Sequence, residues 1–138
     1  MILPCKKAGD GTNIVPAAVT AGLDTVGMRC PDCAVTRAVI AAAGVPVAAP
    51  SGNTSGRPSP TSAAAMLEDM EGKIDAILDD GPCSVGVEST IIDLTVTPPR
   101  LLRPGGVTLE ELEDALGEVA VDEAVRRLMA PGEQPKAT

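Results

Sequence analysis

Histidine and all three aromatic residues are absent from this chain of 138 residues. Without histidine the chain lacks the commonest general base at neutral pH and the commonest metal ligand. Without Phe, Tyr or Trp no nucleic-acid base can stack on an aromatic ring, and the core must be built from small aliphatic side chains. The length fits a single domain, but a domain with no aromatic residue at all suggests that part of it is missing.

Positive charge and long apolar runs are also scarce. Lys and Arg number 11 against 19 Asp and Glu, which gives a net charge of −8. Such an acidic chain is a poor partner for a phosphate backbone, so we expect no direct nucleic-acid binding. No apolar run approaches the roughly 18 residues of a membrane span. The start "MILPCKKAGD" has no basic region of the kind that begins a signal peptide, and these features predict a cytoplasmic protein with no membrane partner.

The four cysteines include one close pair, Cys30 and Cys33 in "CPDC". A C-x-x-C motif is typical of a redox pair or of half a zinc site. A zinc site needs further ligands, and the chain has neither a second C-x-x-C nor a histidine, so we expect no structural metal. We favour two thiols beside a turn in a reducing compartment. The redox alternative stays open, because a predicted strand precedes the motif and a predicted helix follows it.

Helices and strands are predicted to alternate along the chain, which indicates an α/β fold with a mixed sheet. Capping and turn residues predict a helical turn at 16–21, helices at 34–43, 61–70, 108–116 and 121–129, and strands at 25–29, 45–50, 74–79 and 87–95, the last with a hairpin partner in "RLLRPGG". Thr108 and Glu111 form a capping box. Leu109, Leu112 and Leu116 form an apolar stripe, and Glu68 and Asp69 are expected on the solvent side of their helix.

The stretch "APSGNTSGRPSPT" at 49–61 has the composition of a flexible linker. Its position, after a predicted strand and before a predicted helix, instead favours an ordered loop that directs backbone N–H groups at an anion. Its three prolines would stiffen such a loop. The P-loop pattern is absent, so a surface loop without a ligand remains an equal alternative on these grounds alone.

Two further stretches suggest anion binding. "GVEST" places Ser89 just before a predicted strand, and "RLLRPGG" places Arg103 at a strand end beside two glycines. Arg29 ends the strand at 25–29. Arginine is well suited to bidentate contact with a carboxylate or phosphate, although each arginine taken separately is more typical of a solvated surface.

Four ordered stretches, "GLDTVGMRCPD", "PVAAPSGNTSGRPSPTSA", "DAILDDGPCSVGVESTIIDL" and "PPRLLRPGGVTLEELE", resemble the YrdC-like threonylcarbamoyl-AMP synthases. The resemblance covers about residues 1–116. It implies an open, twisted mixed sheet with flanking helices around a large cavity. It also implies a nucleotidyltransferase that converts L-threonine, bicarbonate and ATP, the last with Mg²⁺, into threonylcarbamoyl-AMP and pyrophosphate. The product would pass to the tRNA-modifying machinery that makes N6-threonylcarbamoyladenosine.

The resemblance also implies roles for individual residues. It assigns threonine binding to Arg29, Ser51 and Ser89, and ATP binding to Thr25, Asn53, Thr61 and Arg103. No side chain is implied as a catalytic acid or base. The reaction needs substrates held in line and charge neutralised on the leaving pyrophosphate, so the lack of histidine is compatible with it.

The chain departs from the family pattern at its start. "MILPCKKA" resembles a strand in the middle of the family domain, and the Lys-x-Arg pair that helps to bind the triphosphate is not in this sequence. We therefore interpret residues 1–117 as the C-terminal portion of a YrdC-like domain, incomplete at its N-terminus, and 118–138 as a terminal helix and polar tail. We expect the isolated chain to be poorly soluble, oligomeric or partly folded, and to lack synthase activity.

Three other functions compete with the synthase. One is a non-catalytic nucleotide- or threonine-binding fragment. Another is the carbamoyl-transferring domain of hydrogenase-maturation proteins, for which the expected zinc-finger and acylphosphatase-like regions are absent from this sequence. The last is a thiol redox protein that uses Cys30 and Cys33.

Overall fold

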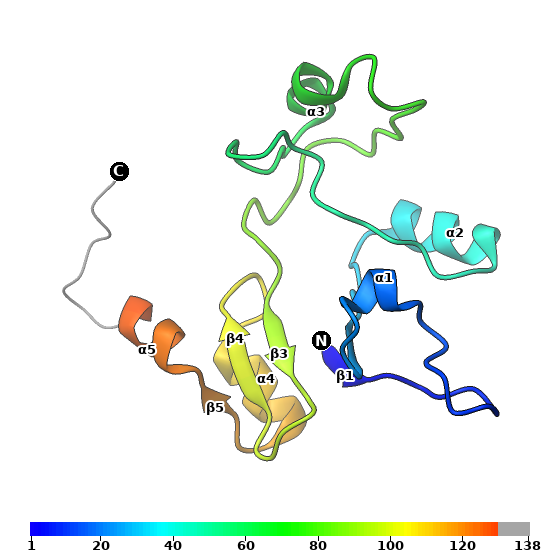
Figure 1. Ribbon diagram of the computed structural model, residues 1–138. Helices are drawn as coiled ribbons and strands as arrows, with labels where there is room; N and C mark the ends of the chain where they lie inside the picture. The colour runs from blue at the N-terminus through cyan, green and yellow to red at the C-terminus, as the bar shows by residue number, and fades with distance from the viewer. Residues whose placement is uncertain (130–138) are drawn as a thin grey trace. The chain divides into compact units, whose positions relative to one another are not determined.

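Five short strands form one mixed, open sheet in the order β2-β1-β3-β4-β5 (Figure 1). A computed structural model describes residues 1–129 of the chain, and the expected polar tail lies outside this range. The strands are β1 (Ile2–Pro4), β2 (Thr25–Gly27), β3 (Ile91–Asp93), β4 (Arg100–Arg103) and β5 (Ala120–Val121). The helices are α1 (Ala17–Thr20), α2 (Ala34–Ala43), α3 (Ala63–Met70), α4 (Leu109–Leu116) and α5 (Glu123–Met129). The α/β class and the mixed sheet are confirmed.

The chain divides into two compact units, which are described separately. The first contains residues 1–30 together with the chain from Val87 onward, and the second contains residues 31–86. All five strands belong to the first unit, with α1, α4 and α5. Helices α2 and α3 belong to the second, together with the loop at 49–61. None of the helices among the described residues is long and apolar enough to cross a bilayer.

Strand directions in the first unit bring three chain segments to one edge of the sheet. β1 is antiparallel to β2 and parallel to β3, and β3 is antiparallel to β4. The end of β2, the beginning of β3 and the end of β4 therefore share an edge. Arg103 ends β4 at this edge, while Arg29 lies two residues after β2 and Ser89 two residues before β3. Thr25 starts β2 opposite Pro4, so it lies at the other edge, about 13 Å from Arg29 at the rise of an extended strand.

The core of the first unit is small and aliphatic. Ile92 of β3, Leu101 of β4, Val119 and Val125 of α5 are buried together. Partly buried side chains surround them, contributed by Leu94, Leu109, Leu112 and Val121. Leu109 and Leu112 confirm the apolar face of α4, whereas Leu116 is 44 % exposed and lies outside the cluster. The segment after residue 117 thus contributes both a strand and two core side chains to the sheet unit.

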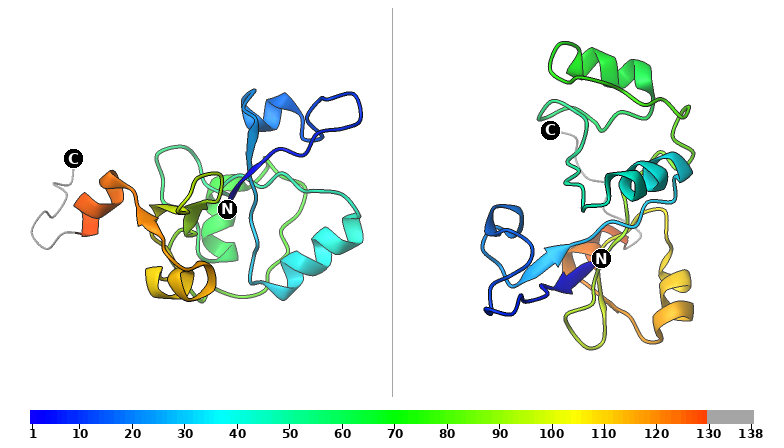
Figure 2. Two further views of the ribbon diagram at one scale, coloured as in Figure 1. Left: turned by 90° about the horizontal axis from the view of Figure 1, so that it is seen from below. Right: turned by 90° about the vertical axis from the view of Figure 1, so that its right-hand side faces the viewer.

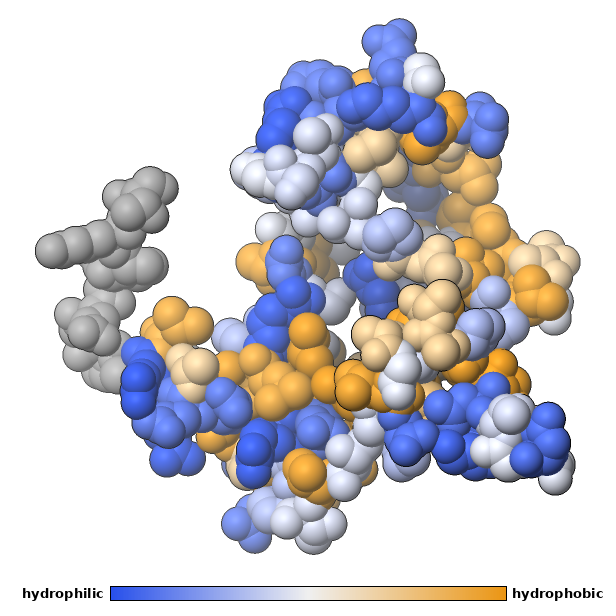
Figure 3. Space-filling view, in the orientation of Figure 1, coloured by the Kyte–Doolittle hydropathy of each residue, from blue (hydrophilic) through white to orange (hydrophobic). Residues whose placement is uncertain are grey.

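The second unit has no comparable core. Within residues 31–86, all of which the structure describes, no apolar side chain is buried. Helices α2 and α3 stand apart in all three ribbon views (Figures 1 and 2). Apolar residues gather on the surface over α2 (Figure 3), where Val35, Val39 and Ile40 are each more than a third exposed. The order of this unit must therefore come from local and polar contacts.

Four strand predictions were wrong in extent or in kind. The strand expected at 25–29 ends at Gly27, so Arg29 lies beyond it. The segments 45–50 and 74–79 form no strand. A strand needs a hydrogen-bonding neighbour, and the two prolines in "VPVAAP" remove ladder donors. The strand expected at 87–95 is shortened to β3. The last helix was expected to begin at Val121, but Val121 pairs with Leu101 as part of β5. Asp122 then accepts from the N–H of Ala124 at 3.0 Å, and the helix begins at Glu123.

Truncating the central core side chain tests this account of the first unit. Leu101 is 2 % exposed, so Leu101→Ala removes buried methyl groups and leaves a cavity. We expect a loss of about 2–5 kcal/mol in the free energy of unfolding, measured by urea titration. Leu128→Ala is the matched control, because Leu128 of α5 is 67 % exposed and should change stability by about 0.5 kcal/mol or less. Equal effects of the two substitutions would contradict the core assignment.

Candidate functional site: two arginines around Ser89

The backbone around Ser89 is held by a close approach of the chain at Gly105. A Cβ at position 105 would lie 2.3 Å from the carbonyl oxygen of Glu88 and 2.3 Å from the backbone nitrogen of Thr90. No other residue fits there, since real Cβ atoms do not approach backbone so closely. The Thr90 hydroxyl donates to the carbonyl of Val107 at 2.8 Å and accepts from the Val107 N–H at 3.0 Å. The "GVEST" and "RPGGV" motifs are thus locked together.

Two arginines contact Ser89, Arg29 from the segment after β2 and Arg103 from the end of β4. Arg29 donates from Nη2 to the Ser89 hydroxyl at 2.9 Å, across 60 positions of sequence. Arg103 donates from Nε to the Ser89 carbonyl at 2.9 Å. The sequence-predicted residues Arg29, Ser89 and Arg103 are therefore brought together at one edge of the sheet, while Thr25 is at the other. We call the three the Ser89 cluster.

The two arginines differ in how their charge is balanced. Arg103 forms an ion pair with Glu88, so an incoming anion would have to compete with a carboxylate. Among the described residues, Arg29 forms no ion pair, and its contact is to a neutral hydroxyl. A guanidinium without a carboxylate partner is ready to accept a carboxylate or phosphate ligand. The cluster therefore presents two guanidinium groups, of which Arg29 has no carboxylate partner among the described residues.

The loop at 49–61, in the second unit, is held by several hydrogen bonds. Asn53 donates from Nδ2 to the carbonyl oxygens of Arg57 at 2.9 Å and of Thr54 at 3.2 Å. Its Oδ1 has only a long contact, 3.4 Å, to the Ser59 hydroxyl. The Thr61 carbonyl accepts from the N–H of Cys83 at 2.8 Å. Ser51 is exposed, and Ser62 rather than Thr61 caps α3.

Asp69 of α3 organises this loop, and it was misplaced by sequence reasoning. It was expected on the solvent side of α3, but it is only 5 % exposed. Its carboxylate accepts from the Thr54 N–H at 3.1 Å and pairs with the Arg57 guanidinium. A small pocket of about 190 Å³ lies between the loop and α3, lined by Arg57, Pro58, Ser59, Pro60, Thr61, Ala65, Glu68 and Asp69. Neither Asp69 nor Gly105 was identified from the sequence.

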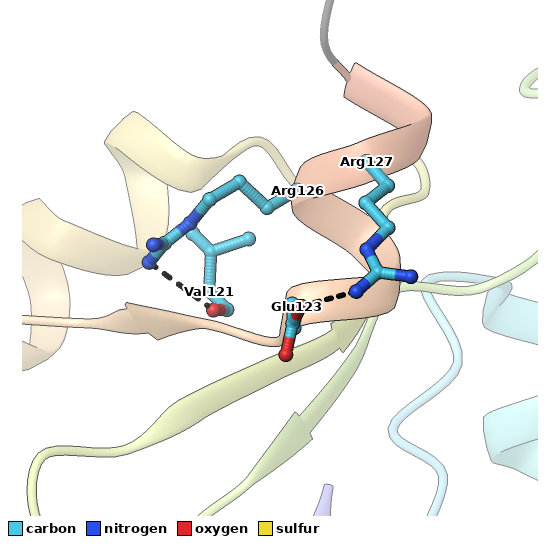
Figure 4. Close-up of a pocket in the computed structure, with 4 residues that line it drawn as sticks. All are labelled: Val121, Glu123, Arg126 and Arg127. Carbon is cyan, nitrogen blue, oxygen red and sulfur yellow. Dashed lines mark hydrogen bonds and ion pairs between the residues drawn. The ribbon is translucent and has the colours of Figure 1, made fainter. Parts of the chain in front are cut away.

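A second pocket, of about 520 Å³, lies beside α5 and is lined by Val121, Glu123, Arg126 and Arg127. Its polar groups already have partners in the chain. Arg126 points toward the Val121 carbonyl and Arg127 toward Glu123, with which it forms an ion pair (Figure 4). None of the residues expected at the site lines this pocket.

Cys33 has a structural role as the N-cap of α2. Its Sγ accepts from the Thr36 N–H at 3.4 Å, and the C-cap of the same helix is Gly44. Hydrogen bonds from the Thr36 side chain and backbone lower the pKa of the Cys33 thiol, against the opposing charge of Asp80. All four cysteines are free. Among the described residues no cluster of three His, Cys, Asp or Glu side chains is placed to hold a metal ion.

A sequence model of one protein family, described as "Telomere recombination" and labelled Sua5_yciO_yrdC, matches residues 2–105. A threonylcarbamoyl-AMP synthase of Pyrococcus abyssi (strain GE5 / Orsay) is 51 % identical over 114 residues, covering 83 % of this chain and 34 % of the relative. The Bacillus subtilis (strain 168) enzyme of that name is 45 % identical, covering 91 % of this chain and 35 % of the relative. This chain thus spans about a third of the length of these relatives.

The solved structures that this chain resembles include two structures of Sua5 from P. abyssi. The crystal structure of P. abyssi Sua5 in complex with L-threonine matches with a TM-score of 0.79 at 44 % identity, covering 99 % of this chain and 37 % of that chain. A second P. abyssi Sua5 structure, carrying two substitutions, matches with a TM-score of 0.80 at 48 % identity, covering 90 % of this chain and 36 % of that chain.

Adding a methyl group at Gly105 should disrupt the Ser89 cluster. Because the Cβ would overlap backbone atoms of Glu88 and Thr90, we expect Gly105→Ala to destabilise the protein by about 1–3 kcal/mol, seen as a lower thermal midpoint. Gly9→Ala is the control, since a Cβ at position 9 meets no atom within 4 Å. An unchanged midpoint for Gly105→Ala would show that the two motifs are not locked as described.

Alkylation of Cys33 should reveal its lowered pKa. Thiolate is the reactive form of cysteine. The rate at which Cys33 reacts with iodoacetamide, followed by mass spectrometry, should therefore rise at a lower pH than for a cysteine in an unstructured peptide. Thr36→Val removes the largest cause of the shift and should move this midpoint upward. The contribution of the Cys33 thiolate to the stability of the folded protein is complete only above the pKa of this thiol in the unfolded chain. It is lost as the pH falls through the lowered pKa of Cys33 in the folded protein. A midpoint unaffected by Thr36→Val would contradict the assignment.

Proposed function

The chain belongs to the Sua5/YciO/YrdC family, and from this premise we propose that its protein is a threonylcarbamoyl-AMP synthase. The reaction joins L-threonine, bicarbonate and ATP into threonylcarbamoyl-AMP, with release of pyrophosphate and water. The observation that carries the proposal is the Ser89 cluster, in which two arginines meet one serine hydroxyl and its carbonyl. The names of the relatives favour this function over the non-catalytic binding fragment.

We propose that Arg29 binds the threonine carboxylate. Its guanidinium has no carboxylate partner among the described residues, and the Ser89 hydroxyl beside it can accept or donate a hydrogen bond to the same amino acid. From the family resemblance we also propose Ser51, which is exposed, as a threonine-binding residue. The threonine complex of the 44 % identical P. abyssi structure supports threonine as the substrate.

We propose that ATP enters with Mg²⁺ and is bound by Arg103, Thr25, Asn53 and Thr61. Arg103 suits the phosphates, because the negative charge of the triphosphate can replace that of Glu88 on the guanidinium. Asn53 uses its amide nitrogen within the loop, so its carbonyl oxygen is the group that remains for the nucleotide. Mg²⁺ favours phosphate oxygens and water as ligands and arrives as part of the substrate.

The chemistry then needs positioning and charge neutralisation rather than a protein nucleophile. The threonine amine attacks bicarbonate and water is lost, which gives a carbamate. A carbamate oxygen attacks the α-phosphorus, and the bond from that phosphorus to the bridging oxygen breaks as pyrophosphate leaves. Arg29 fixes one substrate by its carboxylate, and Arg103 stabilises charge on the phosphates. The product is a reactive adenylate, which we propose passes to tRNA-modifying enzymes in the cytoplasm.

A pair of arginines on one strand provides a sharp test. Arg103 and Arg100 stand at opposite ends of β4, so only Arg103 is at the edge that carries Ser89. In the protein that contains this chain, we expect Arg103→Ala to raise the KM for ATP by about tenfold or more, in line with the loss of a charged hydrogen bond. Arg100→Ala should leave it within about twofold. The measurement is pyrophosphate release, which must require both threonine and bicarbonate.

Two results would contradict the proposal. Pyrophosphate release that continues without threonine would show a different nucleotide reaction. Equal effects of Arg100→Ala and Arg103→Ala would show that the edge of the sheet at Ser89 is not the phosphate site.

A further inference from the structure

Asp69 is the one buried charged side chain among the described residues, at 5 % exposed. A buried carboxylate is strongly unfavourable unless it is paired and hydrogen-bonded. Asp69 meets both conditions through two residues of the loop: its Oδ2 accepts from the Thr54 N–H at 3.1 Å, and its Oδ1 pairs with the Arg57 guanidinium. The helix that carries Asp69 is thereby attached to the loop by charge.

These two attachment points, Thr54 and Arg57, are the ends of a turn that directly follows the sequence-predicted Asn53. The Arg57 N–H donates to the Thr54 carbonyl at 3.0 Å, which closes the turn. The Asn53 amide donates to the carbonyls of the same two residues. Asp69 thus fixes the backbone N–H of Thr54 and the side chain of Arg57. The orientation of Asn53 follows from that geometry.

Apolar packing does not offer another source of order for this turn. No apolar side chain is buried in the second unit. Gly52 allows the flexible side chain of Met66 to approach the loop, where a Cβ would lie 2.5 Å from its sulfur and methyl carbon, but Met66 itself is only partly buried. The carboxylate is therefore the main tertiary constraint on residues 53–57.

We propose that Asp69 is a positioning residue for nucleotide binding: it touches no substrate, but it holds residues 53–57 of the loop at 49–61 in the conformation that receives ATP. This inference deepens the proposed function and rests on it for the identity of the ligand. Its structural half, that Asp69 orders the loop, stands on the contacts alone. Neighbouring Glu68 contributes little to the order of the loop, because it is exposed and its one contact with Arg57 is a long ion pair of 3.5 Å.

The test compares Asp69→Asn with Glu68→Gln in the protein that contains this chain. Both substitutions remove one negative charge from α3 at adjacent positions. Amide hydrogen exchange reports the order of the loop without reference to activity. We expect Asp69→Asn to speed exchange at the Thr54 and Arg57 N–H groups by about tenfold, the effect of losing one charged hydrogen bond, while amides within α3 keep their protection. Glu68→Gln should change neither.

Kinetics separate positioning from simple destabilisation. A variant that is only less stable loses active enzyme and lowers the maximal rate at unchanged KM, whereas a disordered loop raises the KM for ATP. We expect Asp69→Asn to raise that KM about tenfold with kcat within twofold. Arg57→Met should reproduce this pattern and Arg57→Lys should recover most of it, because lysine restores the charge opposite Asp69 but not the fork geometry.

The outcomes distinguish the two proposals. The positioning role would be overturned if the Thr54 N–H exchanged as slowly in Asp69→Asn as in the wild type. It would also be overturned if Glu68→Gln had the same effects as Asp69→Asn. The same role would be overturned if Arg57→Lys were as defective as Arg57→Met with loop exchange unchanged, since Arg57 would then be a phosphate ligand rather than the partner of Asp69. Absence of ATP binding by the wild type, with exchange faster in Asp69→Asn, would instead refute the proposed function and leave the loop anchor intact.

Discussion

The contact of Gly105 with the backbone of residues 88–90 determines the arrangement of the first unit. It is closer than any side chain would allow, and the Thr90 hydroxyl fastens it by both donating to and accepting from Val107. This contact continues the β3–β4 pairing beyond the end of the ladder. As a result, Ser89, two residues before β3, and Arg103, which ends β4, lie at the same edge of the sheet. Ser89 can then meet Arg29, which is distant in sequence, because the β2–β1–β3 order brings the end of β2 to that edge as well.

Charge balance determines what this edge can bind. The chain has an excess of acidic residues, and most of its arginines are matched by carboxylates within their own unit, as Arg103 is by Glu88 and Arg37 is by Asp32. Such pairs are worth little in stability at the surface, but they keep guanidinium groups in defined orientations. An exposed pair can exchange its carboxylate for a more highly charged phosphate at small cost. Arg29 differs because its partner is a hydroxyl, so a carboxylate ligand would add charge neutralisation that none of residues 1–129 supplies.

The predictable parts of the fold were those fixed by local chemistry. The bounds of α2 follow from a capping Cys33 and a left-handed Gly44, and α4 begins with the reciprocal bonds of Thr108 and Glu111. Strands at 45–50 and 74–79 could not be judged locally, because a strand exists only where a partner supplies the other half of each hydrogen bond. In the site, the grouping of Arg29, Ser89 and Arg103 was accessible through motif resemblance. Asp69 was not, since an acidic residue late in an amphipathic helix normally faces water and only the folded loop reveals its partners. Gly105 carried a visible signal, a "PGG" turn beside a strand, but its contact lies 15 or more positions away.

The two units hold the residues proposed to bind substrates by different physical means. In the first unit, Ser89 is fixed by backbone contact and by a packed aliphatic core, so little reordering is available there. In the second, the turn at 53–57 depends on one buried carboxylate with two partners, worth a few kcal/mol at most. A loop ordered so weakly can be reshaped by a ligand whose differential contacts supply a similar free energy. Conformational adjustment on ligand binding is accordingly expected in the loop and not in the backbone around Ser89.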